Sequence, residues 1–292
     1  MVSWPRQQVV DLADGVAAVV HGDGEAGVSN AGLVLEDGRA LVIDTMMFPE
    51  MAQGLIDELA HRRAAAEVVV NTHHHVDHIG GNSLFPDARL VAHPRTVETV
   101  EAMGLPAEIY DGFMPAFRGR FAGLDIVVPR ADEGIDLPQA AELRGYAPAH
   151  TPGDTAVWLE ADRILFTGDL CFFGVTPLAV QGLISTWIDA LDDLIGLEPV
   201  VVVPGHGPVG DAGDIVVVRD HLRALLDHGR EAVAGGATLD EALAAFDPGP
   251  VREWIEAERA VVNLERAMQE ARGEIGAADV SAVPPSFARL LH

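Results

Sequence analysis

The stretch Asn71-Thr72-His73-His74-His75-Val76-Asp77-His78 decides how this 292-residue sequence is interpreted. It directly follows an apolar run of strand length. If the strand continues, His73 and His75 point to the same side, whereas Asp77 and His78 turn toward a second position. Burying so many titratable groups without a cation would be costly. The stretch therefore predicts a metal site at the end of a strand.

Three later segments add further metal-binding residue types. His150 lies in His-Thr-Pro-Gly-Asp-Thr, Asp169 in Thr-Gly-Asp and His206 in Pro-Gly-His-Gly. Each follows or ends a strand-like run near glycine, which predicts loop positions on one rim of a sheet. Asp44 ends the apolar run 41–43 and is a further position of the same kind.

This ordered series resembles the metallo-β-lactamase superfamily, whose motif is His-x-His-x-Asp-His followed by His, Asp and His. The match runs from residue 44 to residue 206. The resemblance implies an α/β fold, the αββα sandwich of that superfamily, here with additional C-terminal helices. We expect this domain over residues 1–212, a helical extension packed on it over 213–275, and a loosely held tail over 276–292.

The resemblance also implies two metal ions and assigns their ligands. The first ion would be held by His73, His75 and His150, the second by Asp77, His78 and His206, with Asp169 bridging them. Asp44 would accept a hydrogen bond that orients a ligand, and His74 receives no ligand role. We expect zinc, with iron or manganese as alternatives, because nitrogen and oxygen ligands do not fix the metal.

Hydrolysis follows from such a centre. Zinc lowers the pKa of bound water from about 15.7 to about 7. The resulting hydroxide could attack an ester, thioester or lactone carbonyl while a metal stabilises the oxyanion. Asp77 and Asp169 are the candidate catalytic residues, and Asp77 could also handle the proton.

Differences between this sequence and the better-known branches of the superfamily narrow the range of expected substrates. β-Lactamases of the commonest type have cysteine at the position of Asp169 and a lysine for the substrate carboxylate, whereas here Cys171 comes two residues late and lysine is absent. Glyoxalase II-type thioesterases bind glutathione through basic residues that are scarce here. Both types stay as alternatives, together with a non-heme di-iron redox relative.

Residues 73–82, 167–170 and 203–209 resemble an actinobacterial hydrolase branch that includes stand-alone aromatic polyketide cyclase/thioesterases. This implies an acyl-thioester or other small-molecule substrate, with an acyl carrier protein as a candidate partner. For the substrate pocket we expect the aromatic residues after Asp169 and those of segment 104–121, a core-packed loop or a lid. The candidate pocket residues are Phe172, Phe173, Tyr110, Phe113 and Phe117.

Composition excludes some partners. The chain has 45 acidic residues against 19 basic ones, all arginine, and a formal net charge of -26. Such a field repels nucleic acids and anionic membranes. The uncharged stretch 170–188 is too interrupted by glycine and proline for a membrane span. The single cysteine fits a cytoplasmic protein, and an oligomer stays open.

Periodicity predicts the elements. We expect strands at 16–20, 31–35, 40–43, 67–70, 89–92, 125–128, 143–146, 156–159, 164–166 and 200–203. We expect helices at 49–65, 94–103, 215–234, 238–245 and 250–271. The histidines outside the motifs are expected at the surface or an interface, namely His21, His61, His221, His228 and His292, with His93 structural.

Overall fold

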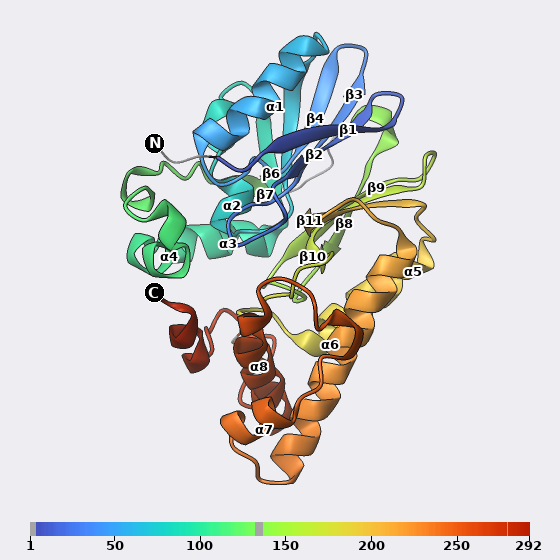
Figure 1. Ribbon diagram of the computed structural model, residues 1–292. Coiled ribbons are helices and arrows are strands. Elements are labelled where there is room, and N and C mark those ends of the chain that lie inside the picture. Colours follow the sequence, from blue (N-terminus) through green and yellow to red (C-terminus); the bar gives the residue numbers. More distant parts are fainter. Residues whose placement is uncertain (1–3, 132–136, 279) are drawn as a thin grey trace.

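The computed structural model, which describes residues 4–131, 137–278 and 280–292, has two β-sheets packed face to face between layers of helices (Figure 1). This is the αββα sandwich that the sequence predicted. The first sheet consists of β1 (Gln7–Ala13), β2 (Val16–His21), β3 (Ala31–Glu36), β4 (Arg39–Ile43), β5 (Ala65–Asn71), β6 (Arg89–Ala92) and β7 (Arg130–Ala131), in that spatial order. The second sheet has the order β11 (Val201–His206), β10 (Ile164–Phe172), β9 (Asp154–Leu159) and β8 (Glu142–Tyr146).

Both sheets are mixed, and their parallel pairs position the site. Strands β1 to β4 pair antiparallel, whereas β4, β5, β6 and β7 run parallel. In the second sheet β10 and β11 are parallel, and β8, β9 and β10 are antiparallel. The carboxyl ends of parallel neighbours lie at the same sheet edge, where α/β proteins place ligand sites. Asp44 directly follows β4, and His206 ends β11.

Alternation along the strands creates separate apolar layers. In β4, Leu41 and Ile43 face the core between the sheets, while Ala40 and Val42 face the helix on the other side. The core between the sheets also contains Phe166 and Val203 from the second sheet. A period of two therefore buries both faces of the central strands.

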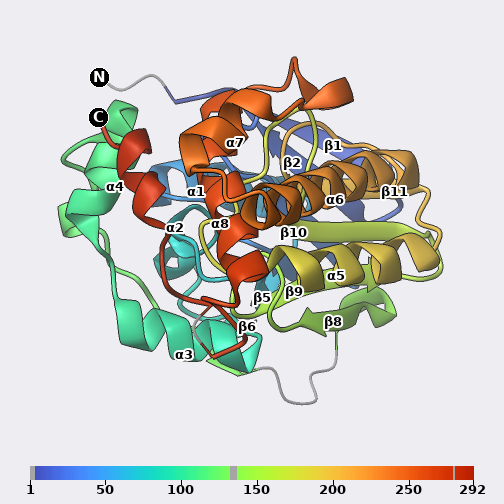
Figure 2. The ribbon, with the colours of Figure 1, turned by 90° about the horizontal axis from the view of Figure 1, so that it is seen from below.

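Helices surround the two sheets (Figure 2). They are α1 (Pro49–His61), α2 (Val76–Ile79), α3 (Pro94–Met103), α4 (Ala107–Phe113), α5 (Ile184–Gly196), α6 (Ala212–Ala234), α7 (Leu239–Ala245) and α8 (Ala260–Arg272). α1 buries Met51, Leu55 and Leu59 at helical spacing beside the first sheet. α5, α6 and α8 share one apolar cluster with β10. α5 and α6 pack on β10, whereas α7 and α8 pack mainly on α6 and on each other.

Several element boundaries differ from the sequence-based predictions. Segment 125–128 is not a strand, and the neighbour of β6 is the two-residue β7. Strand β10 continues to Phe172, well past residue 166. The expected helix 250–271 begins only with α8, because Glu256 adopts a left-handed conformation with φ 60° that interrupts it. Strand β1, whose pattern mixes polar and apolar residues, was missed.

The C-terminal segment is docked, contrary to the expected loose tail. It forms the 3-10 helix η7 (Pro285–Leu290), whose Ser286 and Leu290 are buried. The Phe287 ring lies 5.2 Å from the ring of Phe113 in α4. Buried Arg266 donates hydrogen bonds to the carbonyl oxygens of Val280 and Ala282. The C-terminal segment therefore packs against α4 as an ordered part of the fold.

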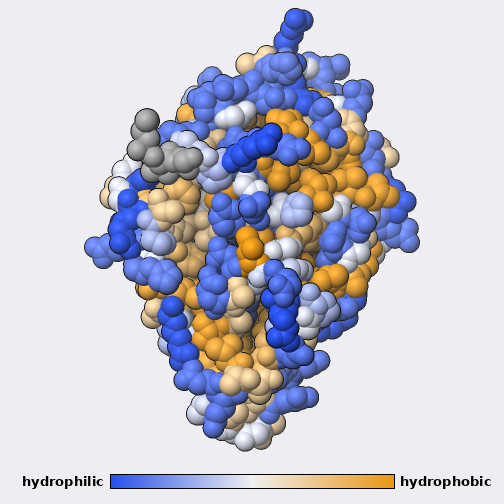
Figure 3. All heavy atoms as spheres, in the orientation of Figure 1, coloured by the Kyte–Doolittle hydropathy of each residue, from blue (hydrophilic) through white to orange (hydrophobic). Residues whose placement is uncertain are grey.

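The surface carries hydrophobic residues among hydrophilic ones. On the face shown in Figure 3 the hydrophobic residues form several patches, separated by hydrophilic residues. Within the described residues, none of the helices combines the length and apolar character that a membrane crossing needs. Two of the histidines expected at the surface are instead buried, His21 and His221.

Candidate metal centre

The predicted ligands come from four places along the chain and meet at one edge of the sandwich. His73 and His75 lie in the turn after β5, and the short helix α2 carries Asp77 and His78. The remaining three are His150 from the loop between β8 and β9, Asp169 within β10 and His206 at the end of β11. All seven side chains are at least mostly buried, with His75 the most accessible.

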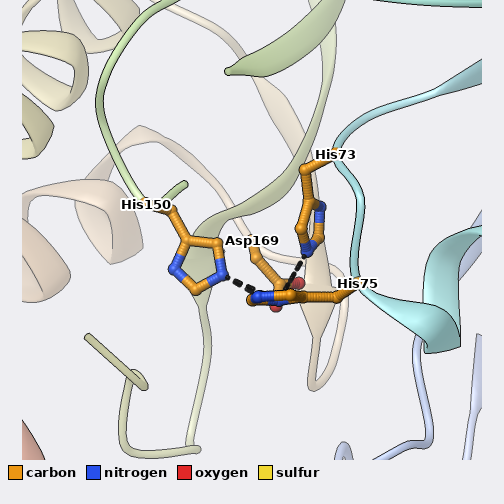
Figure 4. A group of neighbouring side chains, drawn as sticks. All are labelled: His73, His75, His150 and Asp169. Carbon is orange, nitrogen blue, oxygen red and sulfur yellow. Dashed lines mark hydrogen bonds and ion pairs between the residues drawn. The ribbon is translucent and has the colours of Figure 1, made fainter. Parts of the chain in front are cut away.

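These side chains form two donor groups. The first comprises His73, His75, His150 and Asp169, and the second comprises Asp77, His78 and His206. Within each group the candidate ligand atoms all lie within 4.8 Å of one another. Figure 4 shows the first group, whose three imidazoles and carboxylate point toward a common centre from separate chain segments. The grouping is the one that the superfamily resemblance implied.

Asp169 lies between the groups and presents one oxygen to each. Its Oδ2 atom lies 3.7 Å from Nε2 of His73 and 3.5 Å from Nε2 of His150. Its Oδ1 atom lies 3.1 Å from Nε2 of His78 and 3.5 Å from Nε2 of His206. The carboxylate is therefore placed to serve both groups at once.

Outer hydrogen bonds fix which ring nitrogen of His206 and of His75 faces the centre. His206 Nδ1 donates to the carbonyl oxygen of Gly24 at 3.1 Å, and His75 Nε2 donates to Oε1 of Gln181 at 3.2 Å. Because each of these oxygens is an acceptor, the second ring nitrogen keeps its lone pair. His75 consequently offers Nδ1, while His206 offers Nε2.

Asp44 lies outside the two donor groups and holds His78, a member of the second group, by a hydrogen bond. Its carboxylate accepts hydrogen bonds from Nδ1 of His78 and from both the backbone N–H and the hydroxyl of Thr72, each at 2.7 Å. The Thr72 hydroxyl, having donated its proton, can accept from Nδ1 of His73 at 3.0 Å. One buried carboxylate thus orients ligands of both groups.

The electrostatic field at this place favours positive charge. Burial alone would lower the pKa of His78, but the carboxylates of Asp169, Asp44 and Asp77 outweigh it and raise that pKa well above its usual value. In the same way, burial is outweighed at His206, where Asp169 and Asp77 raise the pKa to about 9. At His150, where only Asp169 opposes it, burial dominates and lowers the pKa to about 3.

The donor set fits a pair of divalent cations. Nε2 of His78 and Oδ1 of Asp169 lie 3.1 Å apart, yet neither buried atom makes a hydrogen bond among the described residues, which leaves both able to face a cation. Imidazole and carboxylate donors suit zinc, iron and manganese. Neither donor group contains the thiol of Cys171.

A cavity with about 790 Å³ of empty space, its open mouth included, leads to the donor groups. Asp77, Asp169, His75, His150 and His206 line its inner end. Its walls are mostly apolar and come from α4, the loop after β10 and the C-terminal segment. The wall residues include Met103, Ile109, Met114, Leu178, Val180, Val283 and Phe287.

Three of the five expected pocket residues line this cavity, namely Tyr110, Phe113 and Phe172. Phe117 is not among the lining residues, because its ring packs on Trp4 and Phe48 at 6.2 and 5.7 Å. Phe173 is also excluded. It follows the end of β10, and a Cβ added at Gly210 would come within 2.9 Å of its ring. Both expectations are corrected.

Other cavity residues were missed in the sequence. His74 lines the cavity with both ring nitrogens unpartnered among the described residues, and Gln181 orients His75. Arg259 and Phe287 come from the C-terminal part of the chain. Adjacency to the motif could have drawn attention to His74, whereas the other three need the folded structure.

Comparison with known proteins agrees with this geometry. Residues 24–206, more than half of the chain, match the Metallo-beta-lactamase superfamily. The chain belongs to the metallo-β-lactamase superfamily. Among curated members, the alpha subunit of 2,4-dinitroanisole O-demethylase from Nocardioides sp. (strain JS1661) is 28% identical over 69% of this chain and 56% of its own length. A hydroxyacylglutathione hydrolase from Synechococcus sp. (strain JA-3-3Ab) is 29% identical over 54% of each chain.

The chain thus spans about half the length of these curated relatives. Solved structures share the fold of this superfamily member. The sec-alkylsulfatase Pisa1 from Pseudomonas sp. superposes on 97% of the chain and 53% of its own, with a TM-score of 0.71 and 18% identity. The DIM-1 metallo-beta-lactamase covers 76% of this chain and 99% of its own, with a TM-score of 0.59 and 17% identity. At these identities the likeness concerns the fold.

Proposed function

We propose that the protein is a metal-dependent hydrolase that cleaves an ester, thioester or lactone of a small molecule with an apolar body. The observation that carries the proposal is the placement of Asp169, which presents one oxygen to each donor group at the inner end of an apolar cavity. Membership of the metallo-β-lactamase superfamily supports it.

Residues of the two donor groups would have different roles in this reaction. His73, His75, His150 and Asp169 would hold one ion and Asp77, His78 and His206 the other, with Asp169 shared. When bound, two such ions supply Lewis acidity and lower the pKa of water. Burial raises the pKa of Asp77, but His78 and His206 outweigh it and lower the value to about 2. At neutral pH Asp77 is therefore a carboxylate that faces the cavity and is available to a cation.

The walls support an apolar substrate body. Phe113, Phe172 and Tyr110 surround the approach to the donor groups, and burial raises the pKa of the Tyr110 hydroxyl, which stays protonated at neutral pH. Aromatic rings offer large contact areas to flat or long apolar groups. A free small molecule is accordingly the proposed partner, and presentation by an acyl carrier protein stays a prediction from the sequence.

Thioester hydrolysis of the hydroxyacylglutathione type is a specific variant of this proposal. Relatives named hydroxyacylglutathione hydrolase match about half of the chain, and the aspartate between the donor groups is a feature of that type. This variant has better support than the polyketide cyclase/thioesterase function implied by the sequence, because the relatives reported above carry other activities in their names.

Hydrolysis of an aromatic methyl ether to a phenol and methanol is a second candidate function. The O-demethylase relative matches more of the chain than the hydroxyacylglutathione hydrolases do, and the aromatic cavity suits such a ring. A di-iron redox centre would use the same donors, so metal analysis of the purified protein distinguishes it.

A substrate panel with controlled metal content tests the proposal. We expect hydrolysis of hydroxyacyl thioesters, lactones or aryl esters that disappears after chelation and returns with zinc. The panel should include 2,4-dinitroanisole and a β-lactam. Asp169→Asn should remove the activity, whereas Asp162→Asn, at an exposed turn beyond β9, should not. Full activity in thoroughly metal-free protein would contradict the proposal.

A further inference from the structure

Arg259 introduces a permanent positive charge into the otherwise apolar wall of the cavity. Its side chain lines the cavity but is only 3% exposed. Among the described lining residues it is the one lysine or arginine. It ends the 3-10 helix η6 (Ala257–Arg259), which lies outside the region 24–206 that matches the superfamily. A buried guanidinium is costly unless its donors find acceptors.

The protein supplies hydrogen-bond acceptors for only some of the N–H donors of the Arg259 guanidinium. Nη1 donates to the carbonyl oxygen of Thr176 at 2.9 Å. Buried Nε has no hydrogen-bond acceptor among the described residues, and the nearest carboxylate, Oε2 of Glu256, lies 3.6 Å away. A guanidinium offers five N–H donors. Nη2 donates no hydrogen bond among the described residues and is not one of the fully buried atoms, so its N–H groups stay available.

Arg266 shows what a purely structural buried arginine looks like in this chain. Its Nε, Nη1 and Nη2 donate to three carbonyl oxygens, those of Gly182, Ala282 and Val280, at 3.1, 2.8 and 2.6 Å. Both arginines are buried in the C-terminal part of the chain. Arg266 has acceptors for all three of its nitrogens, whereas Arg259 leaves Nε without one. Packing alone does not account for Arg259.

The segment that carries Arg259 is held firmly against the site. Thr176 N donates to the carbonyl oxygen of Ile255 at 3.0 Å, and Ile255 N donates to that of Gly174 at 3.1 Å. Oε1 of Glu256 accepts a hydrogen bond at 3.0 Å from the backbone N–H of Ala26, which also lines the cavity. The guanidinium is thus fixed before any ligand binds, which lowers the entropic cost of binding.

The charge balance also favours an anion. Arg259 lies in the electrostatic field of carboxylates that include those of Glu256, Asp169 and Asp77. Two divalent cations on the donor groups would more than neutralise the carboxylates of Asp169 and Asp77, leaving the guanidinium in a net positive cavity. Toward the mouth the lining becomes apolar and accessible, with Met103, Ile109 and Val283 exposed by 40, 46 and 45%. The cavity thus pairs one cation with an apolar channel.

We propose that Arg259 binds an anionic group of the substrate, and that the substrate is an apolar organic anion. The planar fork of the guanidinium matches carboxylate, sulfonate and sulfate oxygens, and the apolar remainder would extend toward Met103, Ile109 and Val283. The proposal rests on the proposed hydrolase function for the identity of the cavity, but its test requires no turnover.

Calorimetric binding to the metal-loaded protein tests it with a matched pair of ligands. 1-Octanesulfonate carries an anion that is a weak metal ligand, and 1-octanol has the same chain without charge. We expect wild-type protein to prefer the sulfonate. Arg259→Met should weaken sulfonate binding at least about tenfold and leave octanol binding within about twofold. Arg252→Met, at an exposed arginine of the same segment, is the control and should change neither.

Glu256→Gln should change the sulfonate affinity in the opposite direction to Arg259→Met. The glutamine keeps an oxygen for Ala26 N but removes the carboxylate beside Nε, so sulfonate should bind more tightly than to wild type. This variant keeps the proposal testable if Arg259→Met fails to fold, which thermal unfolding would reveal. Equal affinity of wild type for both ligands, equal losses in Arg259→Met, or unchanged sulfonate binding in Glu256→Gln would each overturn the proposal. A preserved sulfonate preference without hydrolysis of any ester would instead contradict only the proposed function.

Discussion

Asp44 accepts a hydrogen bond from Nδ1 of His78 at 2.7 Å, and this contact ties the end of β4 to the second donor group. Asp44 adopts a left-handed conformation with φ 60°, which aspartate tolerates better than most residues. The geometry keeps Nε2 of His78 directed at Oδ1 of Asp169, 3.1 Å away. A residue outside the two donor groups thereby controls how they are assembled.

Substituting Asp44 should weaken metal binding without removing a ligand. Asp44→Asn tolerates the same backbone conformation but loses the charge that orients His78, so zinc affinity at the second group should fall about 10- to 100-fold. Competition with a chromogenic chelator measures this. Asp37→Asn, at an exposed aspartate with φ 51°, is the control. Equal zinc affinity in Asp44→Asn and wild type would show that His78 is oriented by other contacts.

Two neighbouring phenylalanines should separate substrate binding from stability. Phe113 lines the cavity, so Phe113→Ala should raise KM for a long-chain acyl ester about tenfold and leave a short-chain ester nearly unchanged. Phe117 packs on Phe48 instead, so Phe117→Ala should lower the free energy of unfolding by about 3–5 kcal/mol without affecting chain-length preference. Steady-state kinetics and urea unfolding of both variants check the pair. A loss of chain-length preference in Phe117→Ala would contradict the assignment.

His221 should make the fold sensitive to acid. It is buried in α6, with the rings of Phe246 and Trp254 each 6.1 Å away, and burial lowers its pKa to about 4. Between pH 6.5 and 4 the unfolded chain binds a proton that the folded chain excludes, so stability falls as the pH falls through this range.

Between pH 7 and pH 5 the free energy of unfolding should therefore fall by about 1–2 kcal/mol less in His221→Gln than in wild type. Urea unfolding in the presence of chelator measures this difference, and His61→Gln, at an exposed position, should behave like wild type. Parallel pH profiles of wild type and His221→Gln would show that His221 does not cause the acid sensitivity.

The sequence predicted the metal centre better than the cavity around it, for a physical reason. The donors follow strand ends, so short-range patterns place His73, His206 and their neighbours at one sheet edge. Arg259 reaches the cavity through contacts with segment 174–176, more than eighty residues away in sequence. Local periodicity carries no information about such pairings.

Strand length explains the error at Phe173. The apolar run after Asp169 looked like a loop, in which both phenylalanines could face the substrate. Strand β10 instead continues to Phe172, which stacks on His206 at 5.3 Å and lines the cavity. Neighbouring residues in extended chain point to opposite sides, so Phe173 turns away from the cavity. The register of β10 against β11 could be known only from the folded structure.

The number of metal ions bound per chain tests the central claim most directly. Metal-free protein should be titrated with zinc and the bound ions counted by native mass spectrometry. Wild-type protein should bind two ions, and Asp169→Asn, which removes the carboxylate charge facing both groups, should retain at most one at the same zinc concentration. A wild-type chain that binds one ion or none, or an Asp169→Asn variant that binds two as tightly as wild type, would contradict the account.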